Sequence, residues 1–368
     1  MLRVGFDDQI FQAQQRGGIS KYFVELFARL PDHGVEPVVL STRTRNLHLA
    51  ESGLVPLAAE PGKIGARVVW ASWRLLGRPR TSPRPTPALD LMHHTFTHPA
   101  YLRSWRGPRV MTLFDMTPEL FPEYFKLGNP HFAKRRYCEV SDAIISISQN
   151  TADDMLRLYS AELGAKTHVI PFGVGEAFLD RTGDVLDLPA RYLLFVGVRG
   201  GYKDFGTCWS AFERLAATDP ELQLVVVGGG PFSEAEQRTF DESGLAARVR
   251  RVQPADPEMP EVYRRAEAFV FPSLYEGFGL PTLEALASGT PTILADASCS
   301  REVGGQAARY FVPGDVDDLV SRLREALEPQ RREEARASGP AYARGFTWDL
   351  AASRTAEVYR RIVASAHA

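Results

Sequence analysis

The strongest constraint on this fold is an alternation between short apolar runs and longer helical patterns along most of the chain. Runs rich in leucine and β-branched residues predict strands, and strands separated by helices predict parallel sheets covered on both faces. The runs fall into two groups, so we expect an α/β protein with two doubly wound domains. The first group covers residues 2–6, 37–40, 89–93, 109–113 and 143–147; the second covers residues 192–196, 222–227, 249–252, 268–271 and 292–294.

The expected domain boundary is the segment Pro171-Phe172-Gly173-Val174, where a proline and a glycine follow the last strand of the first group. It predicts a first domain over residues 1–172 and a second over residues 173–347. The length of 368 residues fits this division, since a domain takes roughly 150 residues. Residues 348–368 have the apolar spacing of a terminal amphipathic helix.

Charge and composition exclude several classes of protein. The 43 Lys and Arg residues face 45 acids, and a net charge of −2 offers no basic field for nucleic acid. No apolar window is long enough for a membrane span, and Asp7 and Asp8 interrupt the only apolar run at the N-terminus, so we expect a cytoplasmic protein without a signal peptide. The three widely spaced cysteines predict buried thiols in a reducing compartment: Cys138, Cys208 and Cys299.

One basic segment departs from this balance. Between Glu60 and Asp90 there are six bases, Trp70 and Trp73, and no acid. We hypothesise that residues 63–84 make a peripheral contact with an anionic membrane surface or a lipid-linked acceptor. An ordinary surface helix followed by a proline-rich loop explains the segment equally well.

Two carboxylates flank the start of a predicted helix in the second half of the chain. Glu276 follows a buried strand in a glycine-containing loop, and the carboxyl ends of strands are where open α/β sheets bind ligands. Glu284 is expected in the first helical turn, between Pro281 and the helix stop at Gly289. Such an acid stabilises a helix by itself. Together, however, the two acids can hold several sugar hydroxyls.

Two cations and several glycines follow other predicted strands. Arg199 and Lys203 come after the strand at residues 192–196, where they are suited to hold a diphosphate leaving group, although solvated loop cations are common. Gly17 and Gly18 open a helix, so that backbone N–H groups can approach a phosphate. A glycine turn at residues 228–230 follows another strand.

The segment around Glu276 combines a glycine loop, Pro281, Glu284 and a following Gly-Thr-Pro in one register. In this register it resembles retaining family 4 glycosyltransferases of the GT-B fold, whose two Rossmann-like domains face across a cleft. The resemblance implies that Glu284 binds the nucleotide ribose, that Glu276 binds the transferred sugar, and that the second domain holds a nucleotide sugar. It implies further donor contacts at Arg199, Lys203, Gly17, Gly18, Gly229, Gln253, Gly277, Phe278, Gly279 and Leu280. It also implies that the terminal helix returns to the first domain.

The first domain would then carry the acceptor. Its strand ends supply His93, His94 and Asp115, and we favour His93 and Asp115 as acceptor-side residues, with Asp115 also counted as catalytic. A buried, fully bonded histidine is the safer interpretation for at least one of the pair. The family pattern has a histidine before this aspartate, whereas this chain has Phe114.

No metal or other cofactor is expected. Asp315-Val-Asp317 has the spelling of a metal-binding Asp-x-Asp, but its position predicts that Asp315 caps a helix. Arg199, Lys203 and helix N-termini would supply the positive charge.

The segments Gly200-Gly-Tyr-Lys-Asp-Phe205 and Gly277-Phe-Gly-Leu-Pro281 look most like those of bacterial mannosyl and rhamnosyl transferases of surface-polysaccharide assembly, and this resemblance implies a hexosyltransferase. The favoured donor is GDP-mannose, followed by UDP and dTDP sugars, and the acceptor is a glycan, a lipid-linked saccharide or a small molecule. Two alternatives stay open: a nucleotide-sugar epimerase, and a non-catalytic sugar-nucleotide sensor.

Overall fold

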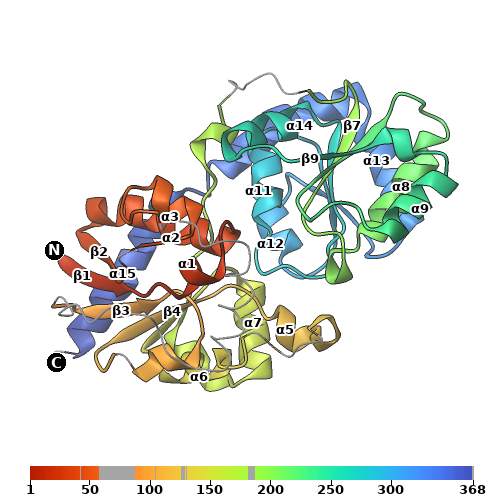
Figure 1. Ribbon diagram of the computed structural model, residues 1–368. Helices are drawn as coiled ribbons and strands as arrows, with labels where there is room; N and C mark the ends of the chain where they lie inside the picture. The colour runs from red at the N-terminus through yellow and green to blue at the C-terminus, as the bar shows by residue number, and fades with distance from the viewer. Residues whose placement is uncertain are drawn as a thin grey trace. The chain divides into compact units, whose positions relative to one another are not determined.

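The computed structural model describes residues 1–41, 43–57, 88–103, 105–125, 129, 131–180 and 187–366. The chain divides into two compact units, one formed by Met1–Gly173 with Trp348–Ala368 and the other by Val174–Thr347. The division falls between Gly173 and Val174, inside the proline- and glycine-containing segment singled out in the sequence. Figure 1 shows the blue terminal helix beside the red helices of the first unit, which it contacts.

The first unit is built on a parallel six-stranded sheet with the order β2-β1-β3-β4-β5-β6. The chain leaves β1 in one direction to form β2, and in the other to form β3 and its successors. The switch point of this sheet therefore lies between β1 and β3. Its strands are β1 Leu2–Phe6, β2 Val35–Val39, β3 Leu91–His94, β4 Arg109–Leu113, β5 Ala143–Ser146 and β6 Thr167–Val169.

Helices and short turns connect these strands. In α2, Tyr22, Phe23, Leu26 and Phe27 recur every three or four residues and are buried, because this spacing places them on one face. The terminal helix α15 packs against α2. In α7, Ser148 accepts a hydrogen bond from the Thr151 N–H at 3.0 Å and caps the helix. The helices are α1 Gln9–Ala13, α2 Gly18–Arg29, α3 Leu47–Glu51, α5 Thr117–Leu120, α6 Lys134–Val140, α7 Gln149–Leu158 and α15 Trp348–Ala366.

The second unit is built on another parallel six-stranded sheet, with the order β12-β11-β10-β7-β8-β9. This is the doubly wound arrangement in which the first strand of the unit, β7, lies in the middle. The switch point lies between β7 and β10. The strands are β7 Tyr192–Val196, β8 Gln223–Val227, β9 Val249–Val252, β10 Ala268–Phe271, β11 Thr292–Ala295 and β12 Arg309–Phe311.

Helices cover this second sheet. Buried side chains of α8, α9 and α13 join the sheet residues in one apolar cluster that includes Trp209, Phe212, Phe240 and Leu323. Helix α11 contacts α10, α12 and α14, and α14 also contacts α13. The helices are α8 Phe205–Ala216, α9 Glu234–Glu242, α10 Met259–Arg265, α11 Leu280–Ala287, α12 Ser300–Gly304, α13 Val316–Ala326 and α14 Pro329–Ala343.

The prediction of two doubly wound α/β domains is confirmed. All three cysteines are free and buried, as expected, and burial raises the pKa of the Cys138 and Cys208 thiols to about 12. Within the described part of the chain, no helix has the length and apolar character needed to cross a membrane. The basic segment over residues 63–84 lies outside the described residues.

Candidate active site

The switch point of the second sheet brings together one predicted cation and one predicted acid. Lys203 follows β7, Glu276 follows β10, and these two strands are neighbours in the sheet. The Lys203 Nζ lies 2.6 Å from Glu276 Oε1, and the two side chains are 15% and 16% exposed. Since ligands of doubly wound sheets bind at the carboxyl ends of strands beside the switch point, this ion pair occupies the expected place for ligand chemistry.

Hydrogen bonds with Ser298 and Cys299 fix the loop that carries Glu276. The Glu276 N–H donates to Ser298 Oγ at 3.0 Å, and the Cys299 thiol donates to the Glu276 carbonyl at 3.3 Å. Gly279 caps α11 with a φ of 79°, and a Cβ there would come within 3.3 Å of the Phe271 ring. The loop therefore needs glycine at this position.

A small hollow opens beside this loop, and one of its polar groups was not predicted from the sequence. The hollow is lined by residues of the Glu276 loop, including Phe278 and Gly279, together with Ser273 and Ser298. Among the described residues, the buried Ser273 hydroxyl has no hydrogen-bond partner. A buried hydroxyl without a partner costs free energy, so Ser273 is suited to bind a ligand group.

Glu284 lies deeper in the helix than predicted. It is the fifth residue of α11, which has no acid in its first turn, so the expectation that Glu284 sits in that turn is wrong. The helix begins at Leu280, and the Pro281 ring occupies its first turn instead. Glu284 is 8% exposed and accepts a hydrogen bond from the Tyr263 hydroxyl at 3.0 Å. Burial and the Glu284 charge raise the pKa of Tyr263 well above its usual value, so Tyr263 stays a donor.

Arg199 has partners of its own within the second unit. Its Nε donates to Glu236 Oε1 at 2.6 Å, and its side chain is only 7% exposed. The sequence predicts Arg199 as a diphosphate contact, whereas in this structure protein groups accept from all three of its guanidinium nitrogens. Lys203 is thus the cation that the structure brings to Glu276.

The predicted glycine turns are present at two other strand ends. Gly228 and Gly229 follow β8 with φ values of 86° and 62°, which favour glycine. Gln253 follows β9 and is exposed. In the first unit, Gly17 is the N-cap of α2 and Gly18 its first residue. The glycine pair does not follow the strand directly, because α1 intervenes.

His93 does not face a ligand site. It is fully buried, its Nδ1 lies 2.5 Å from the Tyr359 hydroxyl, and its Nε2 lies 2.9 Å from Thr112 Oγ1. Burial, with a further contribution from His94, lowers the pKa of His93 to about 3, so the ring is neutral. The prediction of His93 as an acceptor-side residue is wrong, because α15 covers it; the interpretation as a fully bonded buried histidine is correct.

Asp115 lies at the carboxyl end of β4 and is one-third exposed. Its Oδ1 accepts from the Thr117 N–H at 3.0 Å and lies 3.6 Å from Lys134 Nζ. Burial raises the pKa of Asp115, but Lys134 and the other neighbours outweigh it, and the pKa lies below its usual value. Phe114 packs against Tyr22 and Phe172, with ring centroids 5.4 and 6.3 Å apart, so the position of the family histidine carries an aromatic packing residue here.

The Asp-x-Asp segment has a structural role in the second unit. Asp315 Oδ1 accepts from the Asp318 N–H at 3.0 Å and caps α13, as predicted. Asp317 pairs with Arg214. The two acids therefore have separate structural partners.

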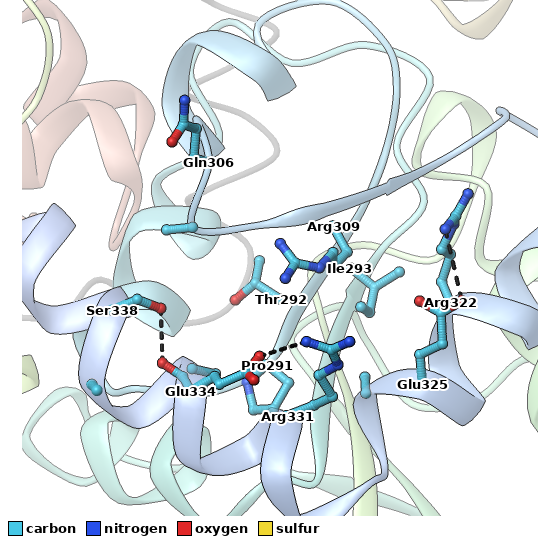
Figure 2. A pocket seen from close by; sticks show the side chains of 14 residues that line it. Pro291, Thr292, Ile293, Gln306, Arg309, Arg322, Glu325, Arg331, Glu334 and Ser338 are labelled. Atoms are coloured by element: carbon cyan, nitrogen blue, oxygen red, sulfur yellow. Dashed lines mark hydrogen bonds and ion pairs between the residues drawn. The ribbon is translucent and has the colours of Figure 1, made fainter.

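A larger hollow lies at the other edge of the second sheet. It has a volume of about 440 Å³, and Figure 2 shows Arg309 and Arg331 around Thr292 and Ile293. Thr292 and Arg309 begin β11 and β12 and Arg331 lies in α14, whereas the predicted site residues follow the strands. No predicted site residue lines this hollow, so we do not assign the active site to it.

Comparisons with known proteins identify the family. The family model described as Glycosyltransferase Family 4 matches residues 16–177, and that of Glycosyl transferases group 1 matches residues 181–344. The chain belongs to family 4 of the glycosyltransferases. This glycosyltransferase is 29% identical to the MMP alpha-(1->4)-mannosyltransferase of Mycolicibacterium hassiacum, in an alignment that covers 76% of this chain and 66% of the relative.

Two further relatives have related names. The D-inositol 3-phosphate glycosyltransferase 2 of Catenulispora acidiphila is 28% identical, with 94% of this chain and 90% of the relative covered. The O-antigen chain mannosyltransferase B of Escherichia coli is 25% identical, with 74% and 75% covered.

Solved structures show the same fold. Sucrose-phosphate synthase from Thermosynechococcus elongatus matches with a TM-score of 0.73 at 22% identity, covering 99% of this chain and all of that one. Anabaena HepE, solved with UDP and glucose, matches with a TM-score of 0.68 at 18% identity, covering 96% and 98%. The glycosyltransferase therefore has the two-domain α/β architecture of the GT-B fold.

Proposed function

We propose that this glycosyltransferase transfers a hexose from a nucleoside diphosphate sugar to an acceptor hydroxyl, with retention of anomeric configuration and without a metal ion. The observation that carries the proposal is the Lys203–Glu276 ion pair at the switch point between β7 and β10. GDP-mannose is the first donor to test, because two relatives are named mannosyltransferases. UDP and dTDP sugars follow, and the Anabaena structure holds UDP and glucose.

Lys203 and Glu276 have complementary tasks in this reaction. The bond from the sugar C1 to the diphosphate oxygen breaks, and the leaving diphosphate gains negative charge that the Lys203 ammonium stabilises. The Glu276 carboxylate accepts hydrogen bonds from hydroxyls of the transferred sugar. The Ser273 hydroxyl is an additional partner for the donor in the same hollow.

The acceptor oxygen bonds to C1 on the face that the diphosphate leaves, which retains the configuration. The proton of the acceptor hydroxyl passes to a leaving phosphate oxygen, so no side chain has to remove it. We propose that the second unit binds the donor and that the first unit carries the acceptor, with Asp115 as the candidate contact. The acceptor is a glycan, a lipid-linked saccharide or a small molecule.

Glu284 is the proposed ligand of the donor ribose, and Tyr263 positions its carboxylate through the 3.0 Å hydrogen bond. The experiment is a thermal-shift screen of GDP, UDP, dTDP and ADP sugars, followed by calorimetry on the best donor. We expect Glu284→Ala to lose donor binding and Glu276→Gln to lose turnover more than binding. Full activity in both variants would overturn the assignment.

Metal independence has a separate test. Because Lys203 can neutralise the leaving diphosphate, we expect EDTA to leave the initial rate of nucleoside diphosphate release unchanged. A loss that added Mg²⁺ or Mn²⁺ restores would show that a metal takes part.

The basic segment over residues 63–84 remains our proposed membrane contact. Co-sedimentation with vesicles rich in anionic phospholipid should decrease when Trp70 and Trp73 are replaced by Ala. Unchanged co-sedimentation would remove the segment from the proposal.

A further inference from the structure

All three guanidinium nitrogens of Arg199 donate to protein groups, although Arg199 follows β7 beside the proposed donor site. Its Nε donates to Glu236, its Nη1 to the Gly228 carbonyl at 3.3 Å, and its Nη2 to the carbonyls of Gly230 and Pro231 at 3.0 and 2.9 Å. The guanidinium also lies 4.8 Å from the Phe232 ring centroid. A guanidinium with these contacts has little capacity left for a bidentate phosphate contact.

Glu236 connects this guanidinium to the start of α9. One of its oxygens accepts from Arg199 Nε, and the other accepts from the Ser233 N–H and hydroxyl at 2.7 and 2.8 Å. Ser233 in turn caps the helix by accepting from the Glu236 N–H at 3.2 Å. Burial raises the pKa of Glu236, but the Arg199 and Ser233 hydrogen bonds outweigh it and keep the acid ionised. One carboxylate thus fixes both the helix start and the arginine.

The turn between β8 and α9 depends on this pair. Gly228 and Gly229 are left-handed, and a Cβ on Gly229 would lie 2.7 Å from Arg199 Nη1. A Cβ on Gly228 would lie 3.2 Å from the Gly197 carbonyl oxygen, in the loop after β7. The guanidinium therefore fills the inside of the turn. The turn cannot change its shape without breaking several of its hydrogen bonds with Arg199.

We propose that Arg199 is a positioning residue: with Glu236 as its counterion, it holds the 228–231 turn in the shape that receives the nucleoside part of the donor, while Lys203 supplies the charge for the diphosphate. This inference rests on the proposed function, since it assigns a task within the same donor site. It reverses the role that the sequence assigns to Arg199. Donor affinity should depend on the pair, while the chemical step should not.

The direction in which one substitution changes nucleoside diphosphate affinity distinguishes the two roles. If Arg199 bound phosphate directly, Glu236→Gln would release the guanidinium from its counterion and strengthen nucleoside diphosphate binding. If Arg199 positions the turn, Glu236→Gln weakens the pair and lowers the affinity. Arg199→Lys adds a second test, because lysine keeps the charge but not the planar fork that reaches three carbonyls.

The experiment is calorimetric titration of GDP, GMP, UDP and UMP into the wild-type protein and the variants Arg199→Lys, Arg199→Ala and Glu236→Gln. The matched control is Arg214→Ala, which removes an exposed arginine paired with Asp317 between α8 and α13. We expect each test variant to bind the diphosphate that wild type prefers about tenfold more weakly, with the same factor for the monophosphate. The double variant Arg199→Ala with Glu236→Gln should bind no more weakly than the worse single variant, since the two side chains act as one unit.

Three results would overturn the inference. The first is tighter diphosphate binding by Glu236→Gln, and the second is a loss of affinity in Arg199→Ala that affects the diphosphate but not the monophosphate. The third is unchanged nucleotide affinity in all the variants although their melting temperatures fall. The last result would mark the pair as structural only. A wild-type protein that binds none of the four nucleotides would instead contradict the proposed function. At saturating donor, the kcat of Arg199→Lys should stay within a few-fold of wild type, and a collapse of kcat would contradict a positioning role.

Discussion

The charged groups at the switch points of the two sheets differ in burial. Between β7 and β10 of the second unit, Lys203 and Glu276 form an ion pair that remains partly exposed. Between β1 and β3 of the first unit, Asp7 accepts from the Thr95 hydroxyl at 2.7 Å and lies 2.7 Å from His94 Nδ1, and all three residues are buried. Burial raises the pKa of Asp7, but these partners outweigh it and keep the carboxylate charged.

The difference shows that topology alone does not create a binding site. Both sheets offer strand ends that diverge at the same edge, yet one fills the position with polar groups that bond mainly to each other. The other keeps a charged pair that is 15% and 16% exposed. Each switch point also holds a buried polar atom without a hydrogen-bond partner among the described residues, His94 Nε2 in the first unit and the Ser273 hydroxyl in the second, so the contrast lies in the exposure of the charges. Partly exposed charges at a switch point therefore identify the candidate site better than the fold does.

The largest expected effect is on Lys203. Lys203→Ala should lower kcat by about 10² to 10³, because a preorganised charge at the leaving group contributes about 3 to 4 kcal/mol to the transition state. Nucleoside diphosphate release at saturating donor measures it. Lys166→Ala in the first unit, where the ammonium bonds backbone carbonyls of Glu139 and Ser141, is the control and should retain turnover. Equal rates for both variants would remove the distinction between the switch points.

Asp7→Asn tests the opposite expectation for the first unit. The substitution removes the charge that faces His94, so it should lower the free energy of unfolding by about 2 to 3 kcal/mol without changing donor affinity. Urea unfolding and calorimetry measure the two effects. Asp142→Asn, at an exposed acid that accepts from the Arg109 N–H, should change neither by more than about 0.5 kcal/mol. Weakened donor binding in Asp7→Asn would contradict a purely structural role.

The glycine loops of the two units should also differ. Gly279→Ala places a Cβ at a φ of 79° and against Phe271, so we expect a loss of about 1 to 2 kcal/mol. At Gly18 no heavy atom lies within 4 Å of the position that a Cβ would take, and alanine favours helix, so Gly18→Ala should leave stability unchanged or raise it. Thermal unfolding of both variants makes the comparison. A greater loss at Gly18 would reverse it.

The last prediction concerns His93, whose effect on stability is absent at neutral pH and grows as the pH falls. Its pKa is about 3 in the folded protein but near 6.5 in an unfolded chain, so unfolding takes up a proton between these values. Stability should therefore fall as the pH drops below about 6.5, by up to about 1.4 kcal/mol per pH unit for this group. Unfolding of His93→Gln at pH 7, 6 and 5 should show a weaker decline than wild type. Parallel declines would show that His93 is not held neutral.

Most of the fold could be predicted from local patterns. The runs at residues 2–6, 109–113, 192–196, 249–252 and 268–271 coincide with strands. Among them, β7 and β10 are continuous apolar runs in the middle of their sheet, as expected for parallel strands covered on both faces. Strands β6 and β12 were not predicted; they have three residues each and contain His168 and Arg309. Three residues that include a histidine or an arginine are too few for a recognisable apolar pattern.

The candidate site was less predictable, because its arrangement depends on distant partners. Lys203 and Glu276 are 73 positions apart in the chain, and their meeting follows from the neighbouring positions of β7 and β10. Arg199 has the right chemistry to bind a phosphate, but it forms an ion pair with Glu236, 37 positions away in the chain. His93 and His94 differ by one position, and only the packing of Tyr359 and Asp7 shows that both are internal.

The central claim is that the Lys203–Glu276 edge of the second sheet binds a nucleoside diphosphate sugar. Calorimetric titration of GDP-mannose, UDP-glucose and dTDP-rhamnose into the wild-type protein and Lys203→Ala tests it most directly. We expect wild type to bind one of these donors at a single site and Lys203→Ala to bind it at least tenfold more weakly with an unchanged melting temperature. Equal affinity in the two proteins, or no binding of any donor by wild type, would contradict the account.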